Sequence, residues 1–140
     1  MAIKEKATNQ KASLQMNSNI VSETTTYSGI LDTANYDLGV YFLYVLSAND
    51  STAVNATFSI QEGDAANMSD AADVAAAKLV YGSAVTLTAA NSVGSGVYKE
   101  AVFSTKRYLR IKVVTTGHGV DIQALVFAIV NPELGPTAQV

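Results

Sequence analysis

The residues with the most distinctive chemistry form one basic cluster in the last third of the chain. Lys106, Arg107, Arg110 and Lys112 surround Tyr108. If this segment is a regular β-strand, its even-numbered members share one face, because successive side chains of a strand point to opposite sides. That row predicts, in falling order of preference, a solvated strand face, a surface for an acidic partner protein, or a nucleic-acid contact. Nucleic acid ranks last because the chain has a net charge of −3.

A second set of candidate residues is acidic. Glu62, Asp64, Asp70 and Asp73 carry carboxylate oxygens of the kind that calcium prefers. Their spacing does not match an EF-hand, and carboxylates in loops more commonly form turns and caps. We therefore expect turns here rather than a metal site, and we expect no cofactor.

Catalytic chemistry finds little support in the sequence. The one histidine, His118, stands between two glycines in a turn-like segment, where a histidine is usually solvated. There is no cysteine, which excludes thiol nucleophiles, thiolate metal sites and disulfides within the chain. No serine has the context of a nucleophile elbow. We expect that the protein is not an enzyme.

Length and composition indicate a single small domain. The chain has 140 residues, of which 49% are hydrophobic and only 15% are charged. A low charge content suits a protein that packs against neighbours. The lysine-bearing start is not followed by an apolar run, so we expect no signal peptide, and no stretch is long and apolar enough for a membrane span.

The segment 103–130 predicts two long strands joined by a tight turn. Leu109, Ile111 and Val113 alternate with polar residues, which is typical of a strand with one buried face. The glycines around His118 favour a reversal, so we expect the two strands to pair as a hairpin. The return strand, 122–130, is apolar on both faces, as expected of a central strand.

The rest of the chain extends the β pattern. Residues 39–47 predict a second central strand, and 54–62 alternate. In that alternation we expect Val54, Ala56, Phe58 and Ile60 to face inward and Asn55, Thr57, Ser59 and Gln61 to face solvent. The alanine-rich stretch up to Lys78 predicts either one or two helical turns or a long loop with a helical turn in it.

About eight strands with one short helical excursion predict an all-β, jelly-roll-like β-sandwich. We divide the chain into an extended N-terminal arm with the first strand, residues 1–22, and a single sandwich domain, residues 23–140. The apolar outer faces of 40–46 and 122–130 predict either cover by the N-terminal segment or, preferably, a subunit interface.

Three segments resemble small head proteins of tailed bacteriophages. They are the strand and turn STKRYLRIKVVTTG from Ser104 to Gly117, the strand FSIQEGD from Phe58 to Asp64, and the DVAA step from Asp73 to Ala76. Their order along the chain matches over roughly 27–132, and the N-terminal arm is not covered. The sequence therefore resembles the capsid decoration, or cement, proteins.

The resemblance implies a jelly-roll or related β-sandwich homotrimer that binds the major capsid protein. Such a protein is assembled in the host cytoplasm, sits on the outer surface of the expanded head in the virion, and stabilises the head against internal DNA pressure. No catalytic residue carries over, and neither nucleic acid nor membrane is an expected partner. Candidate capsid or subunit contacts are Lys4, Lys6, Lys11, Lys106, Tyr108, Arg110 and Lys112. The alternative is a carbohydrate-binding or a tail- or fibre-associated β-sandwich module of a virion.

Overall fold

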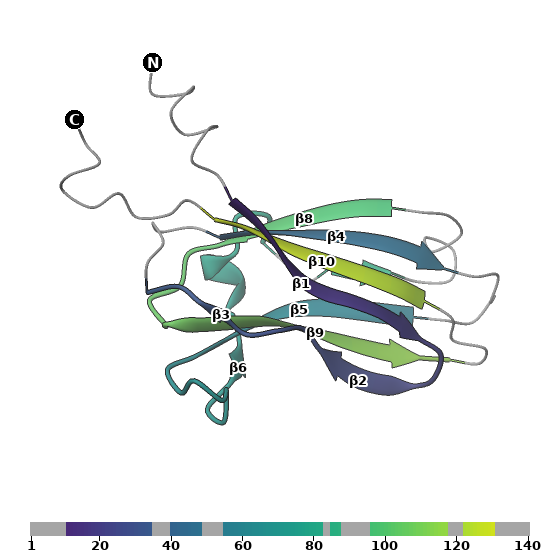
Figure 1. Cartoon of the computed structure of the whole chain (residues 1–140), viewed down its shortest axis with the longest axis horizontal. Helices are drawn as coiled ribbons and strands as arrows, with labels where there is room; N and C mark the ends of the chain where they lie inside the picture. Colours follow the sequence, from purple (N-terminus) through teal and green to yellow (C-terminus); the bar gives the residue numbers. More distant parts are fainter. Residues whose placement is uncertain are drawn as a thin grey trace, which may run out of the picture.

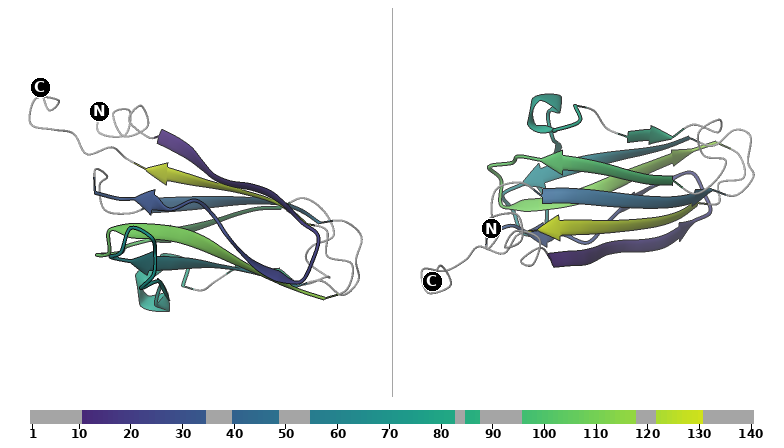
Figure 2. Two further views of the ribbon diagram at one scale, coloured as in Figure 1. Left: turned by 60° about the horizontal axis from the view of Figure 1, so that its bottom comes forward. Right: turned by 90° about the horizontal axis from the view of Figure 1, so that it is seen from above.

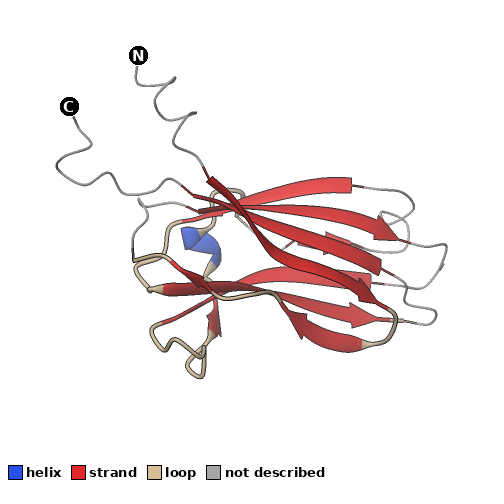
Figure 3. Cartoon of the chain, in the orientation of Figure 1, coloured by secondary structure: helices blue, strands red, loops and turns tan. Residues whose placement is uncertain are grey.

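The protein is a two-layered β-sandwich (Figures 1 and 2). The computed structural model describes residues 11–34, 40–48, 55–82, 85–87, 96–117 and 122–130. Within these ranges the chain forms ten β-strands, all in antiparallel pairs, and one turn of 3-10 helix (Figure 3). The predicted all-β fold class is confirmed.

The first layer, sheet A, has four strands in the order β1, β10, β4, β8. These are β1 (Lys11–Ile20), β10 (Ile122–Val130), β4 (Val40–Ala48) and β8 (Gly96–Val102). The two segments predicted as central strands are β4 and β10, and both are flanked on each side by another strand. The predicted central position of both strands is confirmed, and their neighbours satisfy the backbone hydrogen bonds along both edges.

The second layer, sheet B, is built around β9 and β5, with short strands at its edges. These are β9 (Tyr108–Thr116), β5 (Asn55–Gly63), β2 (Thr24–Tyr27), β3 (Leu31–Asp32), β6 (Ala72–Asp73) and β7 (Val85–Leu87). Both β2 and β3 pair with β9, and both β6 and β7 pair with β5. The strands β3 and β6 have only two residues each, which is too short for an alternating pattern in the sequence to identify them as strands.

The connectivity is that of a double-sheet jelly roll. When the two-residue strands are set aside and the other eight are renumbered along the chain, the sheets read 1-8-3-6 and 2-7-4-5. Successive strands therefore lie in opposite sheets except at β5 and β7. This alternation wraps the chain around a single core between the sheets.

The predicted hairpin over 103–130 is wrong. The strands themselves are where the pattern places them, but β9 pairs in sheet B and β10 pairs in sheet A. Gly117 adopts a positive φ of 116°, and the chain leaves sheet B there instead of folding back. Alternation reveals that a segment is a strand but not which strand lies beside it. Here both strands gain more by facing each other across the core.

The core lies between the inner faces of the two sheets. Leu109, Ile111 and Val113 of β9 are at most 1% exposed, and so are Ala124 and Val126 of β10. The other members of this buried cluster are Met16, Ile20, Leu31, Ala56, Phe58, Ile60, Val74, Val102, Ile122, Ala128 and Val130. The inward orientation predicted for Ala56, Phe58 and Ile60 is thus confirmed, and Val54 lies outside the described residues.

The outer face of β5 is more deeply covered than alternation alone predicts. Ser59 and Gln61 were expected to face solvent, yet they are only 9% and 7% exposed. The cover comes from the neighbouring strands of the same sheet. Gln61 lies between β9 and the short strand β6, with Arg110 and Asp73 as its register partners. Long side chains on neighbouring strands therefore cover the small and neutral residues of β5.

Of the two alternatives for the alanine-rich stretch, the loop is correct. Its helical part is the single 3-10 turn η1 (Ala76–Lys78). The preceding loop is organised by the Asp70 carboxylate, which accepts hydrogen bonds from the backbone N–H groups of Asp64 (2.8 Å) and Ala65 (3.1 Å). A carboxylate that satisfies two backbone donors favours a turn over a helix at this position.

The edges of sheet A are both protected against further strands. At β1, a β-bulge interrupts the register near Gln15, whose carbonyl oxygen accepts the N–H of Gly29 at 2.8 Å. At β8, the segment after η1 runs alongside, with Leu79 bridged to Val102. Glu100 holds the same segment, because its buried carboxylate accepts the N–H of Tyr81 at 2.9 Å. Bulges and covering loops of this kind oppose edge-to-edge association.

We predict that the core between the sheets dominates stability. Ile111→Ala removes a side chain with no exposed surface and should destabilise the fold by about 3 kcal/mol. Val114→Ala, on the outer face of the same strand, is the matched control and should cost much less. Urea titration of both variants measures the difference. Similar losses for the two would contradict the assignment of the faces of β9.

Candidate functional site

A row of interacting polar side chains crosses the outer face of sheet B. The row consists of Tyr27 (β2), Arg110 and Lys112 (β9), Gln61 (β5) and Asp73 (β6), and we call it the polar row. Four different strands contribute to it, because the register places Tyr27 opposite Lys112 and Gln61 between Arg110 and Asp73. The row therefore exists only in the folded sheet.

Arg110 is the centre of the polar row. Its guanidinium carbon lies 3.9 Å from the centroid of the Tyr27 ring, a close cation–π contact. Its Nε donates a hydrogen bond to Oε1 of Gln61 at 2.9 Å. The same amide donates through Nε2 to Oδ1 of Asp73 at 2.8 Å. Arg110 is thus held in one orientation from two sides.

Lys112 closes the other end of the polar row. Its Nζ donates to both carboxylate oxygens of Asp73, at 2.8 and 2.7 Å. Partial burial raises the pKa of Asp73, but the hydrogen bonds from Lys112 and Gln61 together lower it further, so the pKa lies below its ordinary value. Asp73 is therefore a charged carboxylate at neutral pH, and it offsets one of the two basic groups.

The predicted basic stripe is only partly a strand face. Tyr108, Arg110 and Lys112 alternate on β9 with the buried residues, as expected. Lys106 lies before the strand begins, and its Nζ forms an ion pair with Asp64. Arg107, between them, makes a bidentate pair with Asp32 at 2.9 and 2.8 Å. The stripe is therefore largely neutralised within the chain.

Of the three predicted N-terminal contacts, only Lys11 lies within the described residues, and it is not part of this surface. Lys11 begins β1 of sheet A, where its backbone pairs with Val130, so it belongs to the other layer. Lys4 and Lys6 lie outside the described residues, and so does His118.

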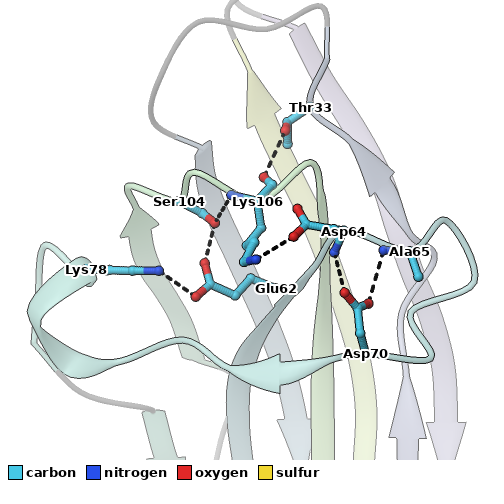
Figure 4. Close-up of polar contacts among 8 residues, drawn as sticks. All are labelled: Thr33, Glu62, Asp64, Ala65, Asp70, Lys78, Ser104 and Lys106. Atoms are coloured by element: carbon cyan, nitrogen blue, oxygen red, sulfur yellow. Dashed lines mark hydrogen bonds and ion pairs between the residues drawn. The ribbon is translucent and has the colours of Figure 1, made fainter.

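A second polar cluster fastens one end of the sandwich (Figure 4). We call it the end network; its members are Glu62, Asp64, Asp70, Lys78, Ser104 and Lys106. At its centre is Glu62, whose carboxylate accepts from Lys78 Nζ at 2.6 Å and from the hydroxyl of Ser104. Glu62 thereby ties the end of β5 to η1 and to the segment that leads from β8 into β9.

The electrostatics of Glu62 reflect opposing effects. Partial burial raises its pKa, while the hydrogen bonds from Lys78 and Ser104 and the nearby positive charges lower it by more. The net pKa lies below its ordinary value. The Glu62 side chain is 11% exposed against 36% for Lys78, so this ion pair is the least solvated of the four in the described part of the chain.

The four acidic residues considered for calcium are all engaged by the protein itself. Glu62 binds Lys78 and Ser104, Asp64 binds Lys106, Asp73 binds Lys112 and Gln61, and Asp70 accepts two backbone N–H groups. Among the described residues, no group of three or more acidic or histidine side chains is arranged to hold a metal ion. Likewise, no helix of that part of the chain is long and apolar enough to cross a membrane.

Sequence reasoning missed Tyr27, Gln61 and Asp73 as members of the polar row. The signal for Gln61 was present, because it faces outward on an alternating strand. Tyr27 and Asp73 reach the row through β2 and β6, strands of four and two residues. Their positions beside β9 and β5 depend on the sheet order, which the sequence pattern does not contain.

The chain matches no protein-family profile and no curated protein sequence. Among solved structures it is similar to the PBSX exported protein XepA, with a TM-score of 0.58 and 17% identity, covering 89% of this chain and 38% of XepA. It is also similar to a structure of Bacillus endospore appendages, a family of disulfide-linked pili, with a TM-score of 0.51 and 9% identity. That match covers 89% of this chain and 88% of the appendage chain. At these identities the similarity establishes the β-sandwich fold alone.

We predict that the end network makes stability depend on pH through Glu62. Because its pKa is lowered in the folded state, its contribution is present above about 4.5, the ordinary pKa, and is lost as the pH falls through the folded value. Glu62→Gln should therefore cost about 2 kcal/mol at neutral pH and progressively less in acid. Chemical denaturation at several pH values measures this.

Asp64→Asn is the matched control for that experiment, because Asp64 also pairs with a lysine but its side chain is 59% exposed. Exposed pairs contribute little, so its loss at neutral pH should be clearly smaller. A Glu62→Gln deficit that stays constant into acid would show that the ionised carboxylate is not its source.

Proposed function

We propose that the protein is a structural component of a phage virion that decorates the outer surface of the expanded head and binds the major capsid protein there. The observation that carries the proposal is the polar row on the outer face of sheet B. The resemblance of residues 27–132 to capsid decoration proteins supplies the identity of the partner. The role requires a rigid adhesive surface and no catalytic residue.

The polar row is suited to binding a protein surface. Arginine and tyrosine are enriched at interfaces and often provide much of the binding energy. Arg110 is held by Tyr27 and Gln61 before any partner arrives, so binding sacrifices less side-chain entropy than it would with a free arginine. Tyr27 remains 47% exposed and can still contact a partner.

In this proposal, binding of the protein stabilises the expanded head by mass action. A ligand that binds the expanded shell and not its precursor shifts the equilibrium towards the expanded form. In a homotrimer, three copies of the polar row would engage neighbouring capsid subunits together, so that modest single contacts add through effective concentration. The proposed partners are therefore the major capsid protein and two further copies of this chain.

A carbohydrate-binding module is the weaker alternative. Sugar sites in β-sandwich proteins commonly use an open aromatic face for stacking. In the polar row, one face of Tyr27 is occupied by Arg110 at 3.9 Å, which leaves less of the ring open for stacking on a sugar. A tail- or fibre-associated role uses the same kind of adhesive surface and is distinguished by location in the virion.

We predict that Arg110→Ala lowers the affinity for expanded heads about tenfold or more, because it removes the centre of the polar row. Arg107→Ala is the matched control: it makes the same change of charge at a nearby position, outside the row. Co-sedimentation of each purified variant with undecorated expanded heads measures binding, and thermal melting verifies the fold. Equal affinities for the two variants would contradict the role of the polar row.

We also predict that removing residues 1–10 weakens binding to heads without unfolding the sandwich, since Lys4 and Lys6 leave with the arm while β1 stays intact. The same sedimentation assay and a melting curve provide the measurement. Unchanged binding would remove the N-terminal arm from the proposed contact.

Quantitative mass spectrometry of purified virions tests the location. Many copies per particle, found on expanded heads and not on unexpanded ones, are the expected result. A few copies per particle would indicate a tail or vertex protein, and absence from virions would overturn the proposal.

A further inference from the structure

The basic side chains of the described residues differ in whether a carboxylate compensates their charge. Four of them form an ion pair, and the pairs are Lys78–Glu62, Lys106–Asp64, Arg107–Asp32 and Lys112–Asp73. Arg110 forms no ion pair with any carboxylate in the described part of the chain. Since Asp73 compensates Lys112, the polar row retains one uncompensated positive charge, and that charge lies on Arg110.

The groups that hold Arg110 are themselves neutral. The Tyr27 ring packs against its guanidinium group, with the guanidinium carbon 3.9 Å from the ring centroid, and Oε1 of Gln61 accepts from its Nε at 2.9 Å. The carboxylate of Asp73 instead accepts hydrogen bonds from Lys112 and from the Gln61 amide. Arg110 is therefore oriented without being neutralised, whereas a carboxylate would both orient and neutralise it.

The terminal Nη groups of Arg110 have no hydrogen-bond partner in the described part of the chain. An arginine side chain has five N–H donors, and the bond to Gln61 uses only the one on Nε. The buried side-chain polar atoms that lack a partner among the described residues are Ser59 Oγ and Glu100 Oε2. The Nη groups are not among these buried atoms, so they reach solvent and are available to a ligand.

We propose that Arg110 binds a carboxylate of the partner protein, the side chain of an aspartate or a glutamate, through its two Nη groups. The planar guanidinium matches the two oxygens of a carboxylate and can donate two parallel hydrogen bonds to them. One residual charge matches one singly charged carboxylate. A phosphate group, with up to two negative charges, is more commonly bound by several basic groups, and Lys112 is already paired with Asp73.

The proposed carboxylate contact rests on the function proposed above, since it names the chemical group that the major capsid protein presents to the polar row. It also makes the contact selective. A partner with an apolar or basic group at this point would desolvate the charge of Arg110 without compensating it. Tyr27, which is 47% exposed, supplies apolar surface beside the pair and helps to exclude water from it.

Two further variants test the contact on expanded heads. Arg110→Gln keeps a polar side chain but removes the charge, and it should lower the affinity for undecorated expanded heads about tenfold or more. Arg110→Lys should lower the affinity as well, because an ammonium group cannot donate the two parallel hydrogen bonds of a guanidinium. Arg107→Gln is the matched control outside the polar row and should bind as the wild type does. Wild-type affinity for Arg110→Gln or for Arg110→Lys would overturn the inference.

An NMR titration tests the same site without heads. Arg107 and Arg110 are the two arginines of the chain, so the Arg→Gln variants assign their side-chain signals. In proton–nitrogen correlation spectra of the full-length protein, sodium acetate should shift the signals of Arg110 more than sodium chloride does at equal ionic strength. The signals of Arg107 should respond less, because Asp32 already holds that side chain. A response of Arg110 to sodium phosphate and not to acetate would assign the site to phosphate groups and overturn the inference, as would no response to either anion.

The two assays separate failure of the carboxylate contact from failure of the proposed function. If the wild-type protein does not bind heads, the head-binding role is overturned, and the NMR titration still tests whether Arg110 takes a carboxylate. If Arg110→Ala loses binding while Arg110→Gln keeps it, the polar row remains the contact and the carboxylate is overturned. Melting curves verify that every variant is folded.

Discussion

The burial of β9 against β10 across the core is the constraint on which the rest of the molecule depends. Each strand has one face that is almost completely excluded from water, and each lies in the interior of a different sheet. Two long apolar faces that are close in sequence could be buried as a hairpin only if a second layer covered them. In the jelly roll, each strand serves as the cover for the other, and the remaining strands extend the two layers sideways.

The two outer faces solve the problem of solvent exposure in different ways. Sheet B places charged groups outward and pairs them with one another, so its face is hydrated and rigid. On sheet A, β1 and β10 place Leu14, Leu125, Phe127 and Ile129 outward; Leu14 is 53% exposed and the other three are partly covered. Among the described side chains, the outer face of sheet B therefore bears charged groups, whereas the outward residues of β1 and β10 are uncharged.

Local patterns were sufficient for the strands and insufficient for their arrangement. Period-two alternation located β9 and the inward residues of β5, because the direction of a side chain depends only on its own strand. The same pattern led to a hairpin that does not exist, because pairing is decided by the whole core. The residues of the polar row likewise divide into those that a local pattern predicts and those that depend on the sheet order. Arg110 and Lys112 were predicted on one face, whereas Tyr27 and Asp73 approach them through short strands whose neighbours depend on the sheet order. Lys106 was expected on that face as well, but the strand begins two residues later.

The register of sheet A has a consequence for how the chain folds as it is synthesised. Lys11 pairs with Val130, and β4 also pairs with β10, so the centre of this sheet is the last of the described strands to leave the ribosome. Similarly, β2, β3 and β5 cannot pair with β9 until β9 has been synthesised. Before β9 and β10 arrive, the emerging chain can therefore form the pairing of β4 with β8 and the contacts of β5 with β6 and β7, but neither sheet can be completed. Topologies dominated by such distant pairings fold slowly and leave apolar strands exposed in the meantime. For this domain, the vulnerable period lasts until β10 has been synthesised.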